Sequence, residues 1–335
     1  MVTFRFYVVS TVAFFLALAA GVVLGSALDQ TIVDSLHSSL DRVEGNLDDT
    51  VAAMDARKKE IDDLNAYVEQ SAPAMLTNQL TGTSTLVVAE PGASEDVVID
   101  LVKRLRTAGS GVPGVVWMDP KWNLTNDADR KALAEASKTT VEASGKAQRK
   151  STWTAVVGQL SALSATGAGS QAGVPGSPSE TTTTVVNQPL GVLDLEVLTS
   201  LENAGFVRLE RVEQSSGQDA VGGVVPLVAV VTAPESQLSD PGVAANELAV
   251  TVQSASIPAV VSEAYTPGDR KRERGTTLTQ VRAGSPTGIS TVDNLDLTAG
   301  RVATALAFAD LRRGKAGNFG FGPDVDQVVP EWHAS

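Results

Sequence analysis

The feature of the sequence that most constrains its fold is an uncharged apolar stretch near the amino terminus. It runs from Phe6 to Leu28, which is 23 residues without one charged side chain. At about 1.5 Å of rise per residue, a helix of this length crosses a hydrocarbon core of roughly 30 Å. The sequence therefore predicts a transmembrane helix over residues 6–28, preceded by a cytoplasmic tail of residues 1–5.

The charges on either side of this helix predict its orientation. Arg5 precedes it, whereas Asp29 and Asp34 follow it, so the positive-inside bias places everything after the helix in the periplasm-like space outside the cytoplasmic membrane. A cleaved signal peptide is the alternative, because Gly25 and Ala27 are small enough to precede a cleavage site. The apolar run is longer than the usual signal-peptide core of about 7–15 residues, which favours a retained single-pass anchor.

Small residues recur every four positions inside the predicted membrane helix, at Ala17, Gly21 and Gly25. This spacing lets two helices approach closely in lipid. Small residues are also common in membrane helices in general, so the pattern does not establish pairing by itself.

A heptad repeat follows and predicts a coiled-coil stalk over residues 29–72. Nine of its eleven a and d positions are apolar, namely Val33, Leu36, Leu40, Val43, Leu47, Met54, Ile61, Leu64 and Val68. Thr50 and Arg57 fill the other two positions, so the coil should be loosest there. Because proline disrupts a helix interior, Pro73 is expected to end the stalk.

A lone amphipathic helix cannot bury its apolar stripe, so the stalk requires a partner. That partner is either an identical chain or a helix of the globular part. The small-residue face of the membrane helix is expected to lie in register below the seam. Together the two features favour a parallel homodimer.

From about Thr83 onward, short apolar runs alternate with helical patterns. Strands are expected at 85–90, 114–119, 206–212, 227–233, 257–264 and 289–293, and helices at 94–108, 153–165, 190–204, 243–254 and 298–313. Strands separated by helices predict an α/β fold with a mostly parallel, helix-covered, Rossmann-like sheet over residues 80–322. A stretch rich in Gly, Ser, Thr and Pro at 167–184 is expected to form a flexible loop, and 323–335 a tail.

The composition excludes several functional classes. The chain has 26 basic and 39 acidic residues, and its net charge of −13 repels phosphate backbones, so nucleic acid is not expected as a partner. It contains no cysteine and only two histidines, His37 and His333. No set of nucleophile, base and orienting group is assembled, so neither catalysis nor a cofactor is expected.

Three carboxylates are the candidate site residues. Glu90, Asp119 and Glu263 stand at the carboxyl ends of predicted strands, the edge where α/β sheets place their ligand crevice. They could hold a hard cation or a cationic group, or instead cap the following helices or face water. A basic run at 270–274 suits either an anionic polymer or a solvated turn.

Three segments of the chain are the most specific: GVVLGS at 21–26, STVDN at 290–294, and the tail from Gly300 to Pro323. With the apolar start, the stalk and the α/β body, they resemble the actinobacterial copper-transport family known as MctB over essentially the whole chain. The tail resembles the family pattern GHYGxGPGA. Here Asn318 and Phe319 replace its histidine and tyrosine, and Asp324 replaces a glycine.

The resemblance implies a role in copper efflux or copper tolerance, with a proposed outer-membrane channel role. Cu(I) prefers thiolate or thioether ligands and Cu(II) prefers imidazole, whereas this chain has four scattered methionines and two separate histidines. A second hypothesis is therefore a dimeric coiled-coil scaffold that recruits or regulates a cell-wall or cell-division partner. An enzyme that uses the strand-end carboxylates is a third, minor hypothesis.

Overall fold

A computed structural model of the chain describes residues 4–168, 193, 195–212, 225–265, 273–284 and 288–331, and the side chains among them except those of 4–6, 24–36 and 163–168. The chain divides into two compact units, Met1–Leu64 and Asn65–Ser335. The first unit consists of one helix, and the second is an α/β head. The sequence analysis expected the head to begin near residue 80. The second unit begins at Asn65, so the last turns of the first helix belong to the head.

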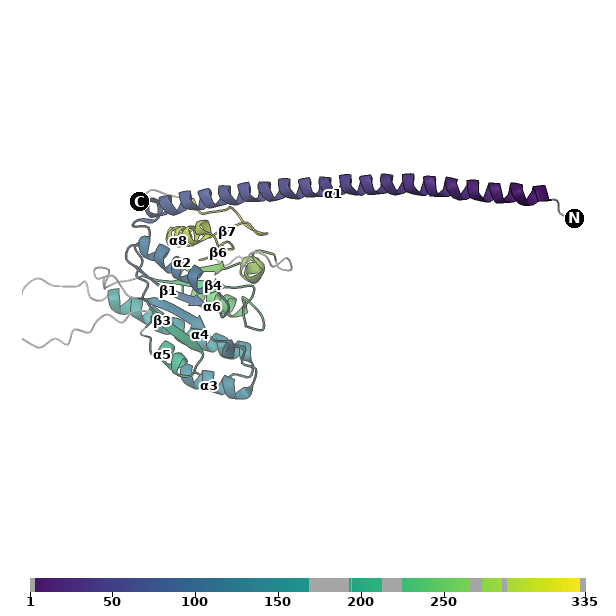
Figure 1. Ribbon diagram of the computed structural model, residues 1–335. Coiled ribbons are helices and arrows are strands. Elements are labelled where there is room, and N and C mark those ends of the chain that lie inside the picture. Colours follow the sequence, from purple (N-terminus) through teal and green to yellow (C-terminus); the bar gives the residue numbers. More distant parts are fainter. Residues whose placement is uncertain are drawn as a thin grey trace, which may run out of the picture. The chain divides into compact units, whose positions relative to one another are not determined.

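Helix α1 is uninterrupted from Phe4 to Leu76, and Figure 1 shows it as one continuous ribbon. The expectation that Pro73 ends it is wrong, because Pro73 lies inside the helix. A proline removes only one N–H donor, and the helix continues past Pro73 to Leu76, where the Pro73 carbonyl accepts a hydrogen bond from Thr77 N at 3.0 Å. Ala72 and Leu76 are fully buried in the core of the head, so packing keeps this last turn helical.

In the described part of the chain, no helix is long and apolar enough to cross a membrane. Phe6, Gly25 and the end of the predicted membrane segment fall among residues whose side chains are not described. Because α1 is continuous, the heptad can be counted back from Val33. Ala17, Gly21 and Gly25 then occupy f, c and g positions, and their expected register with the a and d seam stays a prediction.

The head contains a seven-stranded sheet with the order β3-β2-β1-β4-β5-β6-β7. All neighbouring strands are parallel except β2 and β3, which are antiparallel. The strands are β1 (Thr83–Ala89), β2 (Gly114–Met118), β3 (Val207–Arg211), β4 (Val225–Thr232), β5 (Ala259–Glu263), β6 (Ile289–Val292) and β7 (Asn318–Phe319). The predicted α/β class with a helix-covered sheet is confirmed.

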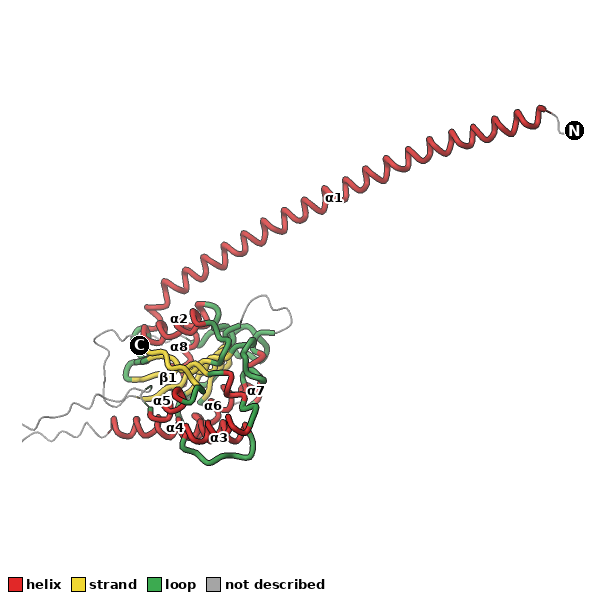
Figure 2. Tube along the Cα trace, turned by 60° about the horizontal axis from the view of Figure 1, so that its bottom comes forward, coloured by secondary structure: helices red, strands yellow, loops and turns green. Residues whose placement is uncertain are grey.

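Helices cover both faces of the sheet, as Figure 2 shows. The end of α1 packs with α2 (Glu95–Thr107) and α8 (Thr298–Arg312) on one face. The other face carries α3 (Asp127–Ser137), α4 (Gly145–Ala168), α5 (Glu196–Asn203), α6 (Val243–Ser254) and α7 (Thr279–Ala283), and two 3₁₀ helices span Pro120–Asn123 and Thr276–Leu278. Alternate residues of the central strands enter the two cores, as the two-residue period of a strand requires.

Most predicted strands and helices lie within a few residues of the observed ones. Helices α3 and α7 and strand β7 were not predicted. Helix α4 begins eight residues before the expected Trp153, and α5 begins six residues after the expected Leu190. The predicted flexible loop at 167–184 lies outside the described residues apart from the end of α4.

Candidate functional site

The three predicted carboxylates do share the carboxyl edge of the sheet. Glu90 follows β1, Asp119 follows β2, and Glu263 is the last residue of β5. The sheet order separates Asp119 from Glu263 by three strand positions, or roughly 14 Å at about 4.8 Å per strand. In the described part of the chain, no group of three or more His, Cys, Asp or Glu side chains could hold a metal ion.

Glu90 is fully buried and binds the start of helix α6. Its carboxylate accepts hydrogen bonds from Gly242 N at 3.1 Å and Ala245 N at 3.4 Å. These donors belong to a helix amino terminus, the position that binds a ligand phosphate in many α/β proteins. Burial raises the pKa of Glu90 to about 7, although the hydrogen bonds favour the ionised form.

Glu263 is also fully buried and holds the loop that follows β5. It accepts hydrogen bonds from Gly275 N at 2.6 Å, from Thr277 N at 2.9 Å and from Thr277 Oγ1 at 2.7 Å. Thr277 Oγ1 also lies 2.6 Å from Thr232 Oγ1 at the end of β4. Glu263 therefore joins three segments of the edge, and its oxygens are occupied by donors of the chain itself.

Asp119 differs from the other two because it is exposed. Its Oδ1 accepts a hydrogen bond from Lys121 N at 2.9 Å, which caps the 3₁₀ helix that begins at Pro120. It lines an open cleft of about 290 Å³ together with Trp117 and Arg208. Asp119 therefore fits the alternative to ligand binding, in which the carboxylate caps a helix and faces water.

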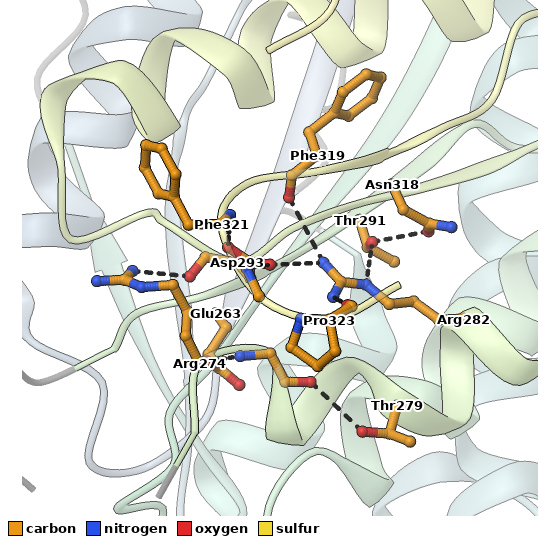
Figure 3. Close-up of polar contacts among 12 residues, drawn as sticks. Glu263, Arg274, Thr279, Arg282, Thr291, Asp293, Asn318, Phe319, Phe321 and Pro323 are labelled. Atoms are coloured by element: carbon orange, nitrogen blue, oxygen red, sulfur yellow. Dashed lines mark hydrogen bonds and ion pairs between the residues drawn. The ribbon is translucent and has the colours of Figure 1, made fainter. Parts of the chain in front are cut away.

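Asp293 is a fourth carboxylate of the same edge, and sequence reasoning missed it. It follows β6, is fully buried, and accepts hydrogen bonds from Phe321 N at 2.8 Å and Gly322 N at 2.9 Å (Figure 3). Arg282 Nη2 pairs with it at 3.0 Å. Its position directly after a predicted strand could have identified it, because Glu90 was chosen for the same position after β1.

The glycine-rich tail is shaped around this carboxylate. A Cβ on Gly320 would lie 1.9 Å from Asp293 Oδ1, and Gly320 has a φ of +131°, which favours glycine. A Cβ on Gly322 would lie 2.9 Å from Asp293 Oδ2. Glycine loops often enclose phosphate groups, but this one encloses an aspartate of its own chain.

Two arginines complete the cluster in Figure 3. Arg282 Nε donates to Thr291 Oγ1 at 3.0 Å and its Nη1 donates to the Pro323 carbonyl at 2.7 Å. Arg274 donates to the Asp293 carbonyl at 2.9 Å and pairs with Asp296. The Arg274 side chain thus binds groups of the head itself. Residues 270–272 of the predicted basic run lie outside the described residues.

The described side chains that could bind copper are at least 17 positions apart along the chain, so they do not form a cluster in the sequence. Met54 and His37 lie on α1, Met75 lies in its last turn, and Met118 is buried in β2. Met1 and His333 lie outside the described residues. Asn318, which replaces the histidine of the family pattern, accepts a hydrogen bond from Thr291 Oγ1 at 2.9 Å.

Together these features define a class of protein: a long amino-terminal helix that continues into a helix-covered α/β head, whose strand-end carboxylates mostly bind the head's own backbone. Within that class, the chain belongs to the family described as "Copper transport outer membrane protein, MctB", which it matches over residues 1–330. The proteins named "Copper transporter MctB" from Mycobacterium bovis (strain ATCC BAA-935 / AF2122/97) and Mycobacterium tuberculosis (strains CDC 1551 / Oshkosh and ATCC 25618 / H37Rv) are similar to it. Each is 26% identical over 340 residues, covering 98% of this chain and 99% of the relative.

Proposed function

We propose that this protein is a non-catalytic, membrane-anchored envelope protein that supports copper homeostasis through protein contacts. The observation that carries the proposal is the closure of the sheet edge at Glu90, Glu263 and Asp293. Each of these carboxylates binds backbone N–H groups of a neighbouring segment, so this part of the edge is filled from within, and the open cleft lies beside Asp119 at the end of β2. A head with these carboxylates occupied, joined to a long helix, suits binding to another protein better than catalysis on a small ligand.

The copper role rests on family membership. Relatives that align with 98% of this chain are named copper transporters, and the family description places them in an outer membrane. The ligand chemistry argues against tight copper binding by this chain itself, because its four methionines are scattered along the sequence and it has no cysteine. An effect on copper would then arise through a partner or through envelope integrity.

The membrane anchor rests on the uncharged stretch from Phe6 to Leu28. Its length suits a single crossing of a bilayer, and its flanking charges place the head outside the cytoplasm. Added protease should digest the head in spheroplasts and spare a short amino-terminal fragment. A mature amino terminus near Leu28 would show that the segment is a cleaved signal peptide instead.

A scaffold for a cell-wall or cell-division partner is the second candidate. The exposed apolar stripe of α1 favours it, because such a stripe serves association with another helix. Identifying the proteins that co-purify with the membrane-extracted chain separates the two candidates.

The decisive experiment is competition for Cu(I) between the protein and a Cu(I) chelator of known affinity. The protein should bind Cu(I) no better than an ordinary acidic protein of the same size. In parallel, a deletion strain should regain copper tolerance when complemented with the His37→Ala, His333→Ala double variant. A stoichiometric site that outcompetes the chelator, or lost tolerance in the double variant, contradicts the proposal.

A further inference from the structure

Apolar side chains at the a and d positions of α1 are open to solvent in the first unit. Leu40, Leu47 and Ile61 expose 63%, 60% and 55% of their surface. Val43, Met54 and Leu64 are exposed to a similar extent. Large apolar side chains that remain exposed at regular spacing mark an interaction surface.

A second seven-residue repeat runs beside this seam. The b position of every heptad is acidic, in the order Asp34, Asp41, Asp48, Asp55, Asp62 and Glu69. In a two-stranded coil the b positions lie on the outer face, so these carboxylates stay in water and apart from those of the other strand. A lone helix has no need of a strict seven-residue repeat, because 3.6 residues per turn makes such a stripe drift around it.

We propose that α1 pairs with α1 of a second copy of this chain, as a parallel, in-register, two-stranded coiled coil from Val33 to Leu64. The parallel direction rests on the proposed membrane anchor, which holds both amino termini in one bilayer. The coil ends at Leu64 because Val68 packs against the core of the head and Glu69 pairs with Arg104. Neither residue is then available to the other strand.

The two weak layers of the seam specify the register. An in-register pair sets Thr50 against Thr50 and Arg57 against Arg57, which weakens two of the five d layers. A shift by one heptad weakens three of the four that remain, because Val43 then meets Thr50, Thr50 meets Arg57, and Arg57 meets Leu64. A long arginine side chain can also direct its charge outward from its own layer.

Charges beside the seam are compatible with this pairing. In a parallel coil each g residue faces the e residue of the next heptad on the other strand. The facing pairs are Ser39 with Glu44, Asn46 with Val51, Ala53 with Lys58, and Glu60 with Asn65. None of them brings like charges together, so a second identical strand meets no repulsion along the seam flanks.

Site-directed crosslinking tests the proposal on the full chain in membranes. Because the chain has no cysteine, a disulfide between two copies that each carry one introduced cysteine joins the same position of both. Val43→Cys at a d position should give disulfide-linked dimers under mild oxidation by diamide. The matched control Ala52→Cys, at an outward f position of the same helix, should give at least tenfold less.

Equal crosslinking of the two variants, or none with Val43→Cys, overturns the parallel pairing. Sedimentation of detergent-extracted Val43→Cys before oxidation should give the mass of two chains, and the mass of one or three overturns the two-stranded coil. Membrane fractionation and a copper-tolerance assay of the same strain distinguish a failure of the pairing from a failure of the proposed function. A variant that stays in the membrane and restores tolerance without crosslinking contradicts the pairing and leaves the proposed function standing.

Discussion

Glu90 gives the structure a measurable dependence on pH. Its carboxyl group is fully buried with a folded-state pKa of about 7, against 4.5 as the ordinary value. A group whose pKa is raised on folding binds its proton more tightly in the native state. Its contribution to stability is therefore complete below pH 4.5, falls as the pH rises toward 7, and is lost above that value.

The size of this effect follows from the shift in pKa. At about 1.36 kcal/mol for each pKa unit, a rise from 4.5 to about 7 corresponds to about 3 kcal/mol. Glu90→Gln removes the titration while keeping an oxygen that can accept from Gly242 N. The free energy of unfolding of the variant, relative to the unaltered protein, should thus rise by about 3 kcal/mol between pH 4.5 and pH 8.

Urea unfolding of the full chain in detergent, followed by tryptophan fluorescence at several pH values, measures this difference. Trp122 and Trp153 report on the head because both are buried and their rings stack at 4.5 Å. Glu95→Gln is the matched control, since the Glu95 side chain is 68% exposed. If the unaltered protein and Glu90→Gln keep a constant difference from pH 4.5 to pH 8, the buried carboxylate does not titrate as argued.

Three further outcomes are expected. Asp293→Asn should lower the free energy of unfolding by about 3–5 kcal/mol, because it leaves the buried Arg282 cation without its partner; urea unfolding measures this loss. Gly320→Ala should cost at least about 1 kcal/mol in the same assay, because the new Cβ meets the Asp293 carboxylate. The double variant Leu40→Asp, Leu47→Asp should be monomeric by light scattering, and a monomer before mutation would mean that the stripe has no second copy as partner.

The sequence predicted the strands well because each is a short apolar run between helical patterns. It missed α3, whose residues DADRKALAEAS are mostly polar, although Asn126 caps this helix by accepting from Asp129 N at 2.8 Å. An Asn cap before an acidic first turn is a signal that could have found it. Strand β7 is two residues long among glycines and forms only because β6 offers an edge, so no local pattern predicts it.

The site was harder to predict because its bonds join distant segments. Glu90 was chosen from its place after a strand, but its donors lie some 150 residues away at Gly242 and Ala245. Nothing near Glu90 in the sequence indicates that these N–H groups occupy it. Pro73 was misjudged for a similar reason, since the burial of Leu76 depends on α2 and α8.

The closed edge also bears on the substitutions in the tail. Asn318 bonds Thr291, and the Phe319 carbonyl accepts from Asp293 N at 3.1 Å, so both residues hold the tail against β6. An amide can fill this position, which means that the fold of the tail does not require the histidine of the family pattern. The motif STVDN contains Asp293, and the glycine tail encloses its carboxylate. In this chain, the packing of the head around Asp293 therefore explains two of the three most specific segments, STVDN and the glycine tail.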